Sequence, residues 1–171
     1  MMTLAAFNAL PAAEAEKYLK DCNAAERWAR QLAAARPFAD VAAWKHSAET
    51  IWRSLGESDY LQAFEAHPMI GDVESLRKKY ASTKAMASGE QSGATGADEA
   101  VLAELAKLNR EYLDKFGFIF IVFATGKSAA EMLAILKSRI GNDRTTEIRN
   151  AAAEQLKISL LRIDKLLAAN A

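Results

Sequence analysis

The chain has few of the residues that disulfides and metal centres need. It contains one cysteine, Cys22, and two histidines, His46 and His67, among its 171 residues. A single cysteine cannot form an intrachain disulfide or a cysteine-based zinc site, and two histidines leave few ligands for a transition metal. We therefore expect a protein that works without a bound metal.

An excess of charge of one sign is also missing. The 22 Lys and Arg residues balance the 22 Asp and Glu residues, which gives a formal net charge of +0. Such a chain has no net positive field to attract the phosphates of a nucleic acid or an anionic membrane surface. Neither is expected as a partner. With 51% hydrophobic and 26% charged residues, the composition is that of a globular domain and excludes a mainly disordered chain.

Long hydrophobic runs and targeting signals are absent as well. The most apolar run, residues 116–124, includes Gly117 and is far shorter than the about 20 residues of a membrane-spanning helix. Residues 1–11 lack the basic and apolar regions of a secretory signal, and the last residues carry no peroxisomal tripeptide. We expect a cytoplasmic location.

The spacing of the apolar residues predicts an all-α fold. They recur mostly every three or four residues, and strict alternation over the length of a strand is hard to find. We predict a single domain over residues 1–171, a helical bundle of about seven to nine helices, with Trp44 and Trp52 in its core. N-caps are expected at Asn23, Asp40, Asp72 and Ser128.

Two segments depart from the helical pattern. Residues 81–97 are rich in Ser, Gly, Thr and Ala, which predicts a functional or disordered loop with room for a short helix around 86–91. Residues 118–123 are β-branched and aromatic, so they form either one extended segment or the start of a fully buried helix. The extended form is favoured, which adds one short extended or irregular segment to the expected bundle.

His67 is the first candidate for chemistry. It lies between a predicted helix end and Pro68, which fixes the backbone beside it. Its ordinary pKa of about 6.5 allows proton exchange near neutral pH. The alternative is a histidine that only bonds free carbonyls at a helix end. His46 lies away from the apolar stripe of its helix and is expected at the surface.

Two further candidates lie elsewhere in the chain. Glu90 and Gln91 combine a carboxylate and an amide within the small-residue stretch, where they could approach a ligand closely. Arg162 lies on the apolar last helix, on the same side as Gln155 and Ser159, and its fork suits a planar anionic or amide-bearing ligand. The alternatives are a solvated polar pair and an exposed arginine that covers apolar surface.

Together these residues resemble one family, the 2-oxo-4-hydroxy-4-carboxy-5-ureidoimidazoline (OHCU) decarboxylases of urate catabolism. The likeness covers almost the full length. Its most distinctive part is His-Pro-x-Ile-Gly, followed by Glu-Gln and then by Phe-Gly-Phe. The matching pieces are Phe7-Asn8, Leu10, Trp28-Ala29, Arg36-Pro37-Phe38, His67-Pro68, Ile70-Gly71, Glu90-Gln91, Leu108-Asn109, Tyr112, Lys115-Phe116-Gly117-Phe118, Phe120, Gly141-Asn142-Asp143-Arg144, Glu154-Gln155-Leu156-Lys157-Ile158 and Leu161-Arg162.

The resemblance implies an all-helical, cofactor-independent carboxy-lyase that converts OHCU, a ureidoimidazoline made from urate, to (S)-allantoin, and it implies a homodimer. The family's catalytic histidine and glutamate fall on His67 and Glu90. Its substrate-binding residues fall on Pro68, Gln91, Arg162 and main-chain groups of Phe118, Ile119, Phe120, Ile121 and Val122.

One position departs from the family pattern. The family usually places a serine three residues before the glutamate, where this chain has Ala87, and Ser88 follows one residue later. Ser88 takes over that role through a local shift of the chain, or the hydrogen bond is absent. Two other functions stay open: an acid/base enzyme acting on another ureido or hydantoin compound, and a non-catalytic helical interaction module.

Overall fold

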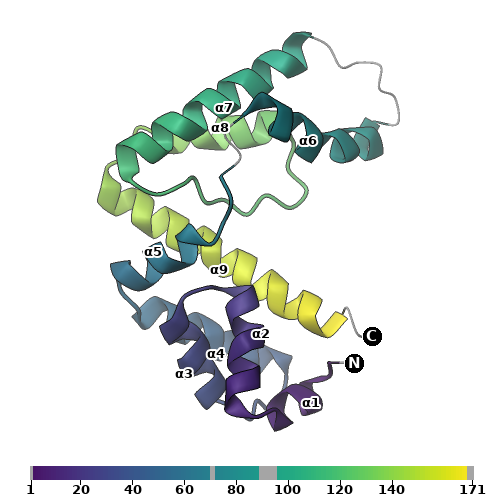
Figure 1. Ribbon diagram of the computed structural model, residues 1–171, viewed down its shortest axis with the longest axis vertical. Helices are drawn as coiled ribbons and strands as arrows, with labels where there is room; N and C mark the ends of the chain where they lie inside the picture. The colour runs from purple at the N-terminus through teal and green to yellow at the C-terminus, as the bar shows by residue number, and fades with distance from the viewer. Residues whose placement is uncertain (1, 70–71, 89–95, 169–171) are drawn as a thin grey trace. The chain divides into compact units, whose positions relative to one another are not determined.

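The computed structural model describes residues 2–69, 72–88 and 96–168, and the regular structure in these ranges is entirely α-helical (Figure 1). The predicted all-α class is therefore confirmed. The described residues form nine helices, within the predicted range of seven to nine. They are α1 (Leu4–Ala9), α2 (Ala12–Cys22), α3 (Glu26–Ala34), α4 (Val41–Ser54), α5 (Glu57–Glu65), α6 (Val73–Ser88), α7 (Gly96–Phe116), α8 (Ala129–Arg139) and α9 (Arg144–Ala168).

The chain forms two compact units, and each is described by itself. The first comprises Met1–Ala66 and Ile148–Ala171, and the second comprises His67–Glu147. Residues 144–147 at the start of α9 thus belong to the second unit, and the rest of α9 belongs to the first. The single domain expected over residues 1–171 stays a prediction.

Three tryptophans form much of the core of the first unit, where α3 packs against α2, α4 and α5. The indole Nε1 of Trp28 donates to the carbonyl of Ala48 over 3.0 Å, and that of Trp52 donates to the carbonyl of Ala152 over 2.9 Å. The ring of Trp44 is fully buried as well. The predicted core positions of Trp44 and Trp52 are confirmed.

Polar side chains begin several helices as the sequence predicts. Asp40 Oδ1 accepts from the backbone N–H of Ala43 over 2.7 Å, and Ser128 forms a capping box with Glu131 at the start of α8. Such side chains satisfy N–H groups that have no partner inside the helix. The predicted caps Asp40 and Ser128 are confirmed.

Asp72 also caps as predicted, but Asn23 does not. Asp72 Oδ1 accepts from the N–H of Ser75 over 2.7 Å, and this hydrogen bond lowers the pKa of Asp72. The N-cap of α3 is Ala25, without a side-chain hydrogen bond, while Asn23 is the C-cap of α2. Asn23 instead donates through Nδ2 to the hydroxyl of Ser159 over 3.1 Å. Its Oδ1, the atom that would cap a helix, accepts from the N–H of Ala25 over 2.9 Å, two residues later and still before α3.

In the second unit, α7 packs against α6 and α8. Arg77 on α6 bonds Glu99 on α7 with both arms of its guanidinium, Nε to Oε1 at 2.9 Å and Nη2 to Oε2 at 2.7 Å. Lys137 on α8 pairs with Glu104 on α7 over 2.8 Å. The buried side chains between these helices include Leu102, Leu105, Tyr112, Met132 and Leu136.

The loop predicted over residues 81–97 is wrong for the part that the structure describes. Helix α6 continues to Ser88, and α7 already begins at Gly96. Ala, Lys and Met favour helices, so the lack of large apolar residues excluded a core position but not a helix. Residues 89–95 lie outside the described residues.

The segment between Phe116 and Ser128 is neither helix nor strand. Gly117 and Gly126 take the left-handed backbone region, with φ of 81° and 77°, which favours glycine and lets the chain leave α7 and turn toward α8. The expected extended or irregular segment is confirmed as irregular, and the alternative of a buried helix start is wrong.

Candidate active site

His67 and Pro68 follow directly on the end of α5. That helix ends at Glu65, with Ala66 as its C-cap, because Pro68 disfavours helical backbone at the residue before it. The side chain of His67 is half-buried and Pro68 is exposed. The histidine is therefore at a helix end, as predicted, and partly open to solvent.

The other members of the predicted catalytic region lie at the edge of the described structure or beyond it. Ser88 is the last residue of α6. Glu90 and Gln91 lie outside the described residues. The pairing of Glu90 with His67 and the role of Ser88 stay predictions.

Arg162 lies in the first unit, on α9, and is half-buried. Its Nη1 donates to the carbonyl of Cys22 over 3.4 Å, a long hydrogen bond. On the same helix, the buried Ser159 accepts from Gln155 Nε2 over 3.2 Å and from Asn23 Nδ2 over 3.1 Å. Because Cys22 and Asn23 both lie at the end of α2, these contacts confirm that Gln155, Ser159 and Arg162 share one side of α9. His67 belongs to the second unit, so its meeting with Arg162 stays a prediction.

Cys22 is not an activated thiol. Burial raises its pKa from 9.0 to about 12, although the nearby Arg162 works in the opposite direction. A thiol with so high a pKa carries almost no thiolate at neutral pH and is a poor nucleophile. The side chain of His46 is exposed, as predicted.

The predicted main-chain binding segment lies in the second unit. The side chains of Phe118, Ile121 and Val122 are buried, and those of Ile119 and Phe120 are half-buried. Side-chain packing therefore fixes the segment, although it has no helix or strand to hold its main chain. No helix or strand pairing uses the N–H and C=O groups of this segment, and the carbonyl of Ile121 accepts instead from Arg139 Nη1 over 2.7 Å.

A buried polar cluster lies behind this segment and consists of Tyr112, Arg139, Asn142 and Glu147. Glu147 Oε1 accepts from Tyr112 Oη over 2.6 Å and from Arg139 Nε over 2.8 Å, while Oε2 accepts from Asn142 Nδ2 over 2.9 Å. Burial and the hydrogen bond to Glu147 raise the pKa of Tyr112, so the phenol stays protonated. The carboxylate of Glu147 is fully buried, but its charge and both of its oxygens are satisfied.

Arg139 and Glu147 are not among the residues predicted from the sequence. Both are charged residues near the ends of helices, at the end of α8 and the start of α9, where charged side chains are usually exposed. A signal was nevertheless present, because Tyr112 and Asn142 both belong to the pieces of the family resemblance. A buried tyrosine hydroxyl and a buried amide require polar partners, and Arg139 and Glu147 supply them.

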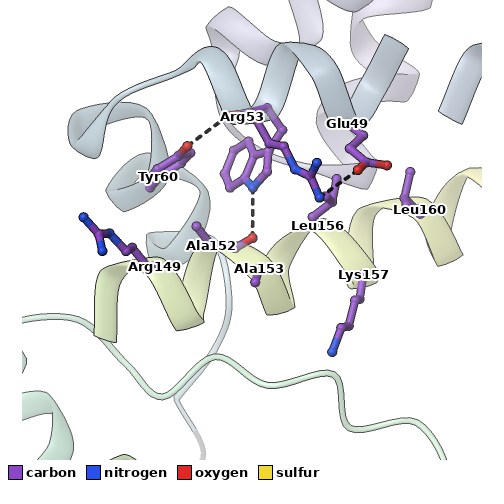
Figure 2. Close-up of a pocket in the computed structure, with 10 residues that line it drawn as sticks. Glu49, Arg53, Tyr60, Arg149, Ala152, Ala153, Leu156, Lys157 and Leu160 are labelled. Atoms are coloured by element: carbon purple, nitrogen blue, oxygen red, sulfur yellow. Dashed lines mark hydrogen bonds and ion pairs between the residues drawn. The ribbon is translucent and has the colours of Figure 1, made fainter. Parts of the chain in front are cut away.

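An open groove lies elsewhere, within the first unit, between α9 and the pair α4 and α5 (Figure 2). Its volume is about 450 Å³. Arg53 at its rim pairs with Glu49 over 2.7 Å, and Tyr60 donates to the carbonyl of Trp52 over 3.0 Å (Figure 2). None of the predicted site residues that the structure describes lines it. The lining residues are Glu49, Trp52, Arg53, Tyr60, Arg149, Ala152, Ala153, Leu156, Lys157 and Leu160.

The described residues show neither a group of metal ligands nor a helix suited to span a membrane. In the ranges 2–69, 72–88 and 96–168, no three His, Cys, Asp or Glu side chains are grouped so that they could hold a metal ion. Among the helices in these ranges, none is both long and apolar enough to cross a membrane.

Solved structures define the class of this fold. A crystal structure of OHCU decarboxylase in the presence of (S)-allantoin is similar, with a TM-score of 0.71 and 34% sequence identity, over 90% of this chain and 98% of that one. A crystal structure of (S)-allantoin synthase shares the fold, with a TM-score of 0.68 and 19% identity, over 96% of this chain and 54% of that one. The fold is therefore that of an all-helical decarboxylase domain.

The family profile described as OHCU decarboxylase matches residues 8–164, and the chain belongs to this family. The predicted family is thus confirmed.

Two relatives illustrate the range of proteins that are similar to this chain. The uric acid degradation bifunctional protein TTL of Arabidopsis thaliana is 36% identical over 86% of this chain, which spans 45% of that protein. The 2-oxo-4-hydroxy-4-carboxy-5-ureidoimidazoline decarboxylase of Amia calva is 30% identical over 77% of this chain and 75% of that protein. The chain thus spans less than half the length of the bifunctional relative.

Proposed function

We propose that this protein decarboxylates OHCU and releases (S)-allantoin. The observation that carries the proposal is the match to the OHCU decarboxylase family over residues 8–164. The similar crystal structure that was determined in the presence of (S)-allantoin supports the same product here. The position of His67 at a helix end beside Pro68, half-buried and partly open to solvent, suits a residue that touches a substrate.

The substrate itself explains why no cofactor is expected. Its carboxylate sits on a ring carbon that also bears a hydroxyl and lies next to an imine-like carbon. When the bond to the carboxylate breaks, carbon dioxide leaves and the electron pair moves toward the imine nitrogen, which takes up a proton. The enol-like product then loses the hydroxyl proton and gains one at the neighbouring carbon. The protein needs to orient the substrate, polarise it and move protons.

His67 and Glu90 carry the proton transfer in this proposal. His67 polarises the substrate hydroxyl or accepts its proton, and Glu90 orients the imidazole. Protonation of the enol-like species from one face gives one enantiomer. An imidazole suits this role because its ordinary pKa lies near neutral pH.

The remaining predicted residues bind the substrate. Arg162 positions the ureido or ring carbonyl oxygens, and a strong ion pair with the departing carboxylate is disfavoured because it would stabilise the ground state. The long contact between Arg162 and the carbonyl of Cys22 is its one hydrogen bond to another described residue. Pro68, Ser88, Gln91 and the main chain of residues 118–122 complete the proposed set.

Two broader properties also stay proposals. The family resemblance implies a homodimer, which sedimentation velocity of the purified protein tests directly. A cytoplasmic location is proposed as well, which fractionation of the source cells tests.

The function is tested by the rate at which OHCU disappears. The compound is generated in place from urate by the two preceding enzymes, and its ultraviolet absorbance is followed with and without this protein. We expect the wild type to accelerate the loss and His67→Asn to be slower by at least about 100-fold, the usual contribution of a general acid or base. His46→Asn is the matched control, because this histidine is exposed on α4, and it keeps the wild-type rate.

The two rates test the decarboxylase function and the role of His67 separately. Wild-type protein that does not change the spontaneous rate contradicts the decarboxylase proposal, and other ureido and hydantoin compounds are then screened. Wild-type acceleration that His67→Asn retains contradicts only the role of His67.

A further inference from the structure

Arg139 makes the one hydrogen bond that holds the main chain of residues 119–122 to another described residue. Its Nη1 donates to the carbonyl oxygen of Ile121 over 2.7 Å. No backbone-to-backbone hydrogen bond joins residues 119–122 to the rest of the described chain. The direction of this stretch of main chain therefore depends on packing and on a single guanidinium.

The guanidinium is itself held rigidly. Nε donates to Glu147 Oε1 over 2.8 Å, Nη2 approaches Tyr112 Oη at 3.3 Å, and the guanidinium carbon lies 4.7 Å from the centre of the Phe120 ring. Arg139 is only 7% exposed, and Glu147 is fully buried. Three contacts from different directions thus leave the donor to Ile121 little freedom to turn.

Stability alone does not explain the buried ion pair between Arg139 and Glu147. Removing two charges from water costs about as much as their attraction returns, and well-packed apolar side chains often serve stability equally well. An apolar pair could not donate to the carbonyl of Ile121. The guanidinium of Arg139 can donate to Glu147 and to the carbonyl of Ile121 at the same time. It thereby links Glu147 to the main chain of residues 119–122.

We propose that Arg139 is a positioning residue for the decarboxylation, which orients the peptide group between Ile121 and Val122. That peptide is planar, so the N–H of Val122 points opposite to the carbonyl of Ile121. By holding the carbonyl on one side, Arg139 directs the N–H of Val122 to the other side, as a donor for a carbonyl oxygen of the substrate. This inference rests on the proposed function, in which the main chain of residues 118–122 binds the substrate.

The test needs a variant that loses the donor without leaving a lone buried charge. Arg139→Met combined with Glu147→Gln removes both charges, keeps similar volumes and leaves a side-chain amide oxygen that can accept from Tyr112. Arg139→Lys keeps the charge and a single, flexible donor. Asn142→Ala is the matched control, because it removes a hydrogen bond to the same carboxylate but none of the side-chain contacts that hold the guanidinium of Arg139.

The first readout is kinetic. We expect the double variant to raise KM for OHCU about tenfold, the effect of losing one well-directed hydrogen bond, with a smaller change in kcat. Arg139→Lys recovers part of the loss, and Asn142→Ala stays close to the wild type in KM even where its thermal stability falls. A merely structural role predicts instead that KM follows stability across all three variants, and that result overturns the proposal.

The second readout observes the amide of Val122 directly. Ile-Val occurs once in the chain, at Ile121-Val122, so protein labelled with carbonyl-13C isoleucine and 15N valine gives a single carbonyl-linked amide signal. We expect (S)-allantoin to shift this signal in the wild type and in Asn142→Ala. In the double variant we expect no shift at the same concentration of (S)-allantoin.

Failure of this inference is distinguishable from failure of the proposed function. A wild type that neither consumes OHCU nor binds (S)-allantoin contradicts the function. An active wild type whose Arg139 variants keep both KM and the Val122 response contradicts the role of Arg139. Should the double variant fail to give a cooperative unfolding transition, Arg139→Lys decides, since an unchanged KM there also overturns the proposal.

Discussion

The side-chain amide of Asn8 and the main chain of Phe38 are joined by two reciprocal hydrogen bonds. Asn8 Nδ2 donates to the carbonyl of Phe38 over 3.0 Å, and the N–H of Phe38 donates to Asn8 Oδ1 over 2.9 Å. Next to this pair, Arg36 Nη1 donates to the carbonyls of Phe7 and Leu10, each over 2.8 Å. Asn8 and Arg36, which belong to the family pattern, therefore attach α1 to the chain around Phe38. We call these hydrogen bonds of Asn8 and Arg36 the clip.

Replacing Asn8 tests the clip. We expect Asn8→Ala to lower the free energy of unfolding by about 1–3 kcal/mol, because two partly buried main-chain groups of Phe38 lose their partner. Urea denaturation followed by circular dichroism measures the change. Gln31→Ala on the exposed face of α3 is the control and stays within about 0.5 kcal/mol of the wild type. Equal stability of the two variants would contradict the structural role.

Two of the buried tryptophans, Trp28 and Trp44, are expected to respond differently to the same substitution. Trp44 stacks on Phe7 at 4.2 Å and on Phe38 at 5.5 Å, but its indole Nε1 is buried without a hydrogen-bond partner among the described residues. Trp28 Nε1 has a partner, the carbonyl of Ala48. Trp→Phe removes a similar volume at both positions but a hydrogen bond only at Trp28.

We therefore expect Trp44→Phe to cost about 1 kcal/mol less than Trp28→Phe, the net value of one hydrogen bond. Chemical denaturation of both variants measures the difference. A larger loss for Trp44→Phe would show that its N–H has a partner in solution.

Cys22 makes stability depend on alkaline pH. Its folded pKa, about 12, lies above the ordinary 9.0, so the folded state keeps a proton that the unfolded chain loses. A raised folded pKa contributes stability that is fully present below pH 9 and is lost as pH rises toward 12. At pH 10.5 the loss amounts to about 2 kcal/mol.

We expect the free energy of unfolding of Cys22→Ala to depend less on pH than that of the wild type. At pH 8 the variant is less stable than the wild type, because it loses part of a buried side chain. Urea denaturation of both proteins between pH 8 and pH 10.5 gives the two slopes. Equal slopes of the free energy of unfolding against pH in the two proteins would contradict the raised pKa of Cys22. Rapid reaction of the native thiol with a thiol reagent at pH 8 would contradict it independently.

Arg162 is expected to act mainly on substrate binding. We predict that Arg162→Gln raises KM for OHCU about tenfold, and that Arg162→Lys recovers only part of it because an ammonium lacks the planar pair of donors. Lys165→Gln, exposed on the same helix, is the control and keeps the wild-type KM. A fall in kcat with KM unchanged would instead assign Arg162 to the reaction step.

Much of the fold could be predicted because its signals are local. The caps at Asp40, Asp72 and Ser128 depend on one side chain and the N–H groups two or three residues later, and all three are present in the structure. The end of α5 before Pro68 follows in the same way from a local steric rule. Asn23 does not cap α3 because the helix begins later than predicted, with Ala25 as its N-cap, and Asn23 Oδ1 accepts from the N–H of Ala25 itself. Its Nδ2 donates to Ser159, 136 positions away in the sequence, a contact that no local rule predicts.

The site could be predicted only in part, for a physical reason. His67 and Arg162 are recognisable from residue type, neighbouring residues and the family pattern. Arg139 and Glu147 gain their meaning from burial against Tyr112 and Ile121, and burial of a charged residue is decided by tertiary packing. Residue type and periodicity favour an exposed position for both, so the cluster appears only in the folded chain.

The most direct test of the proposed function is the handedness of the product. OHCU is generated from urate with the two preceding enzymes, and the circular dichroism of allantoin is recorded at completion for the wild type, His67→Ala and Glu90→Ala. The spontaneous reaction gives racemic allantoin without a lasting signal. We predict a lasting signal of (S)-allantoin for the wild type and none for the two variants, whose helical spectra stay intact. A racemic product from well-folded wild type would contradict the assignment.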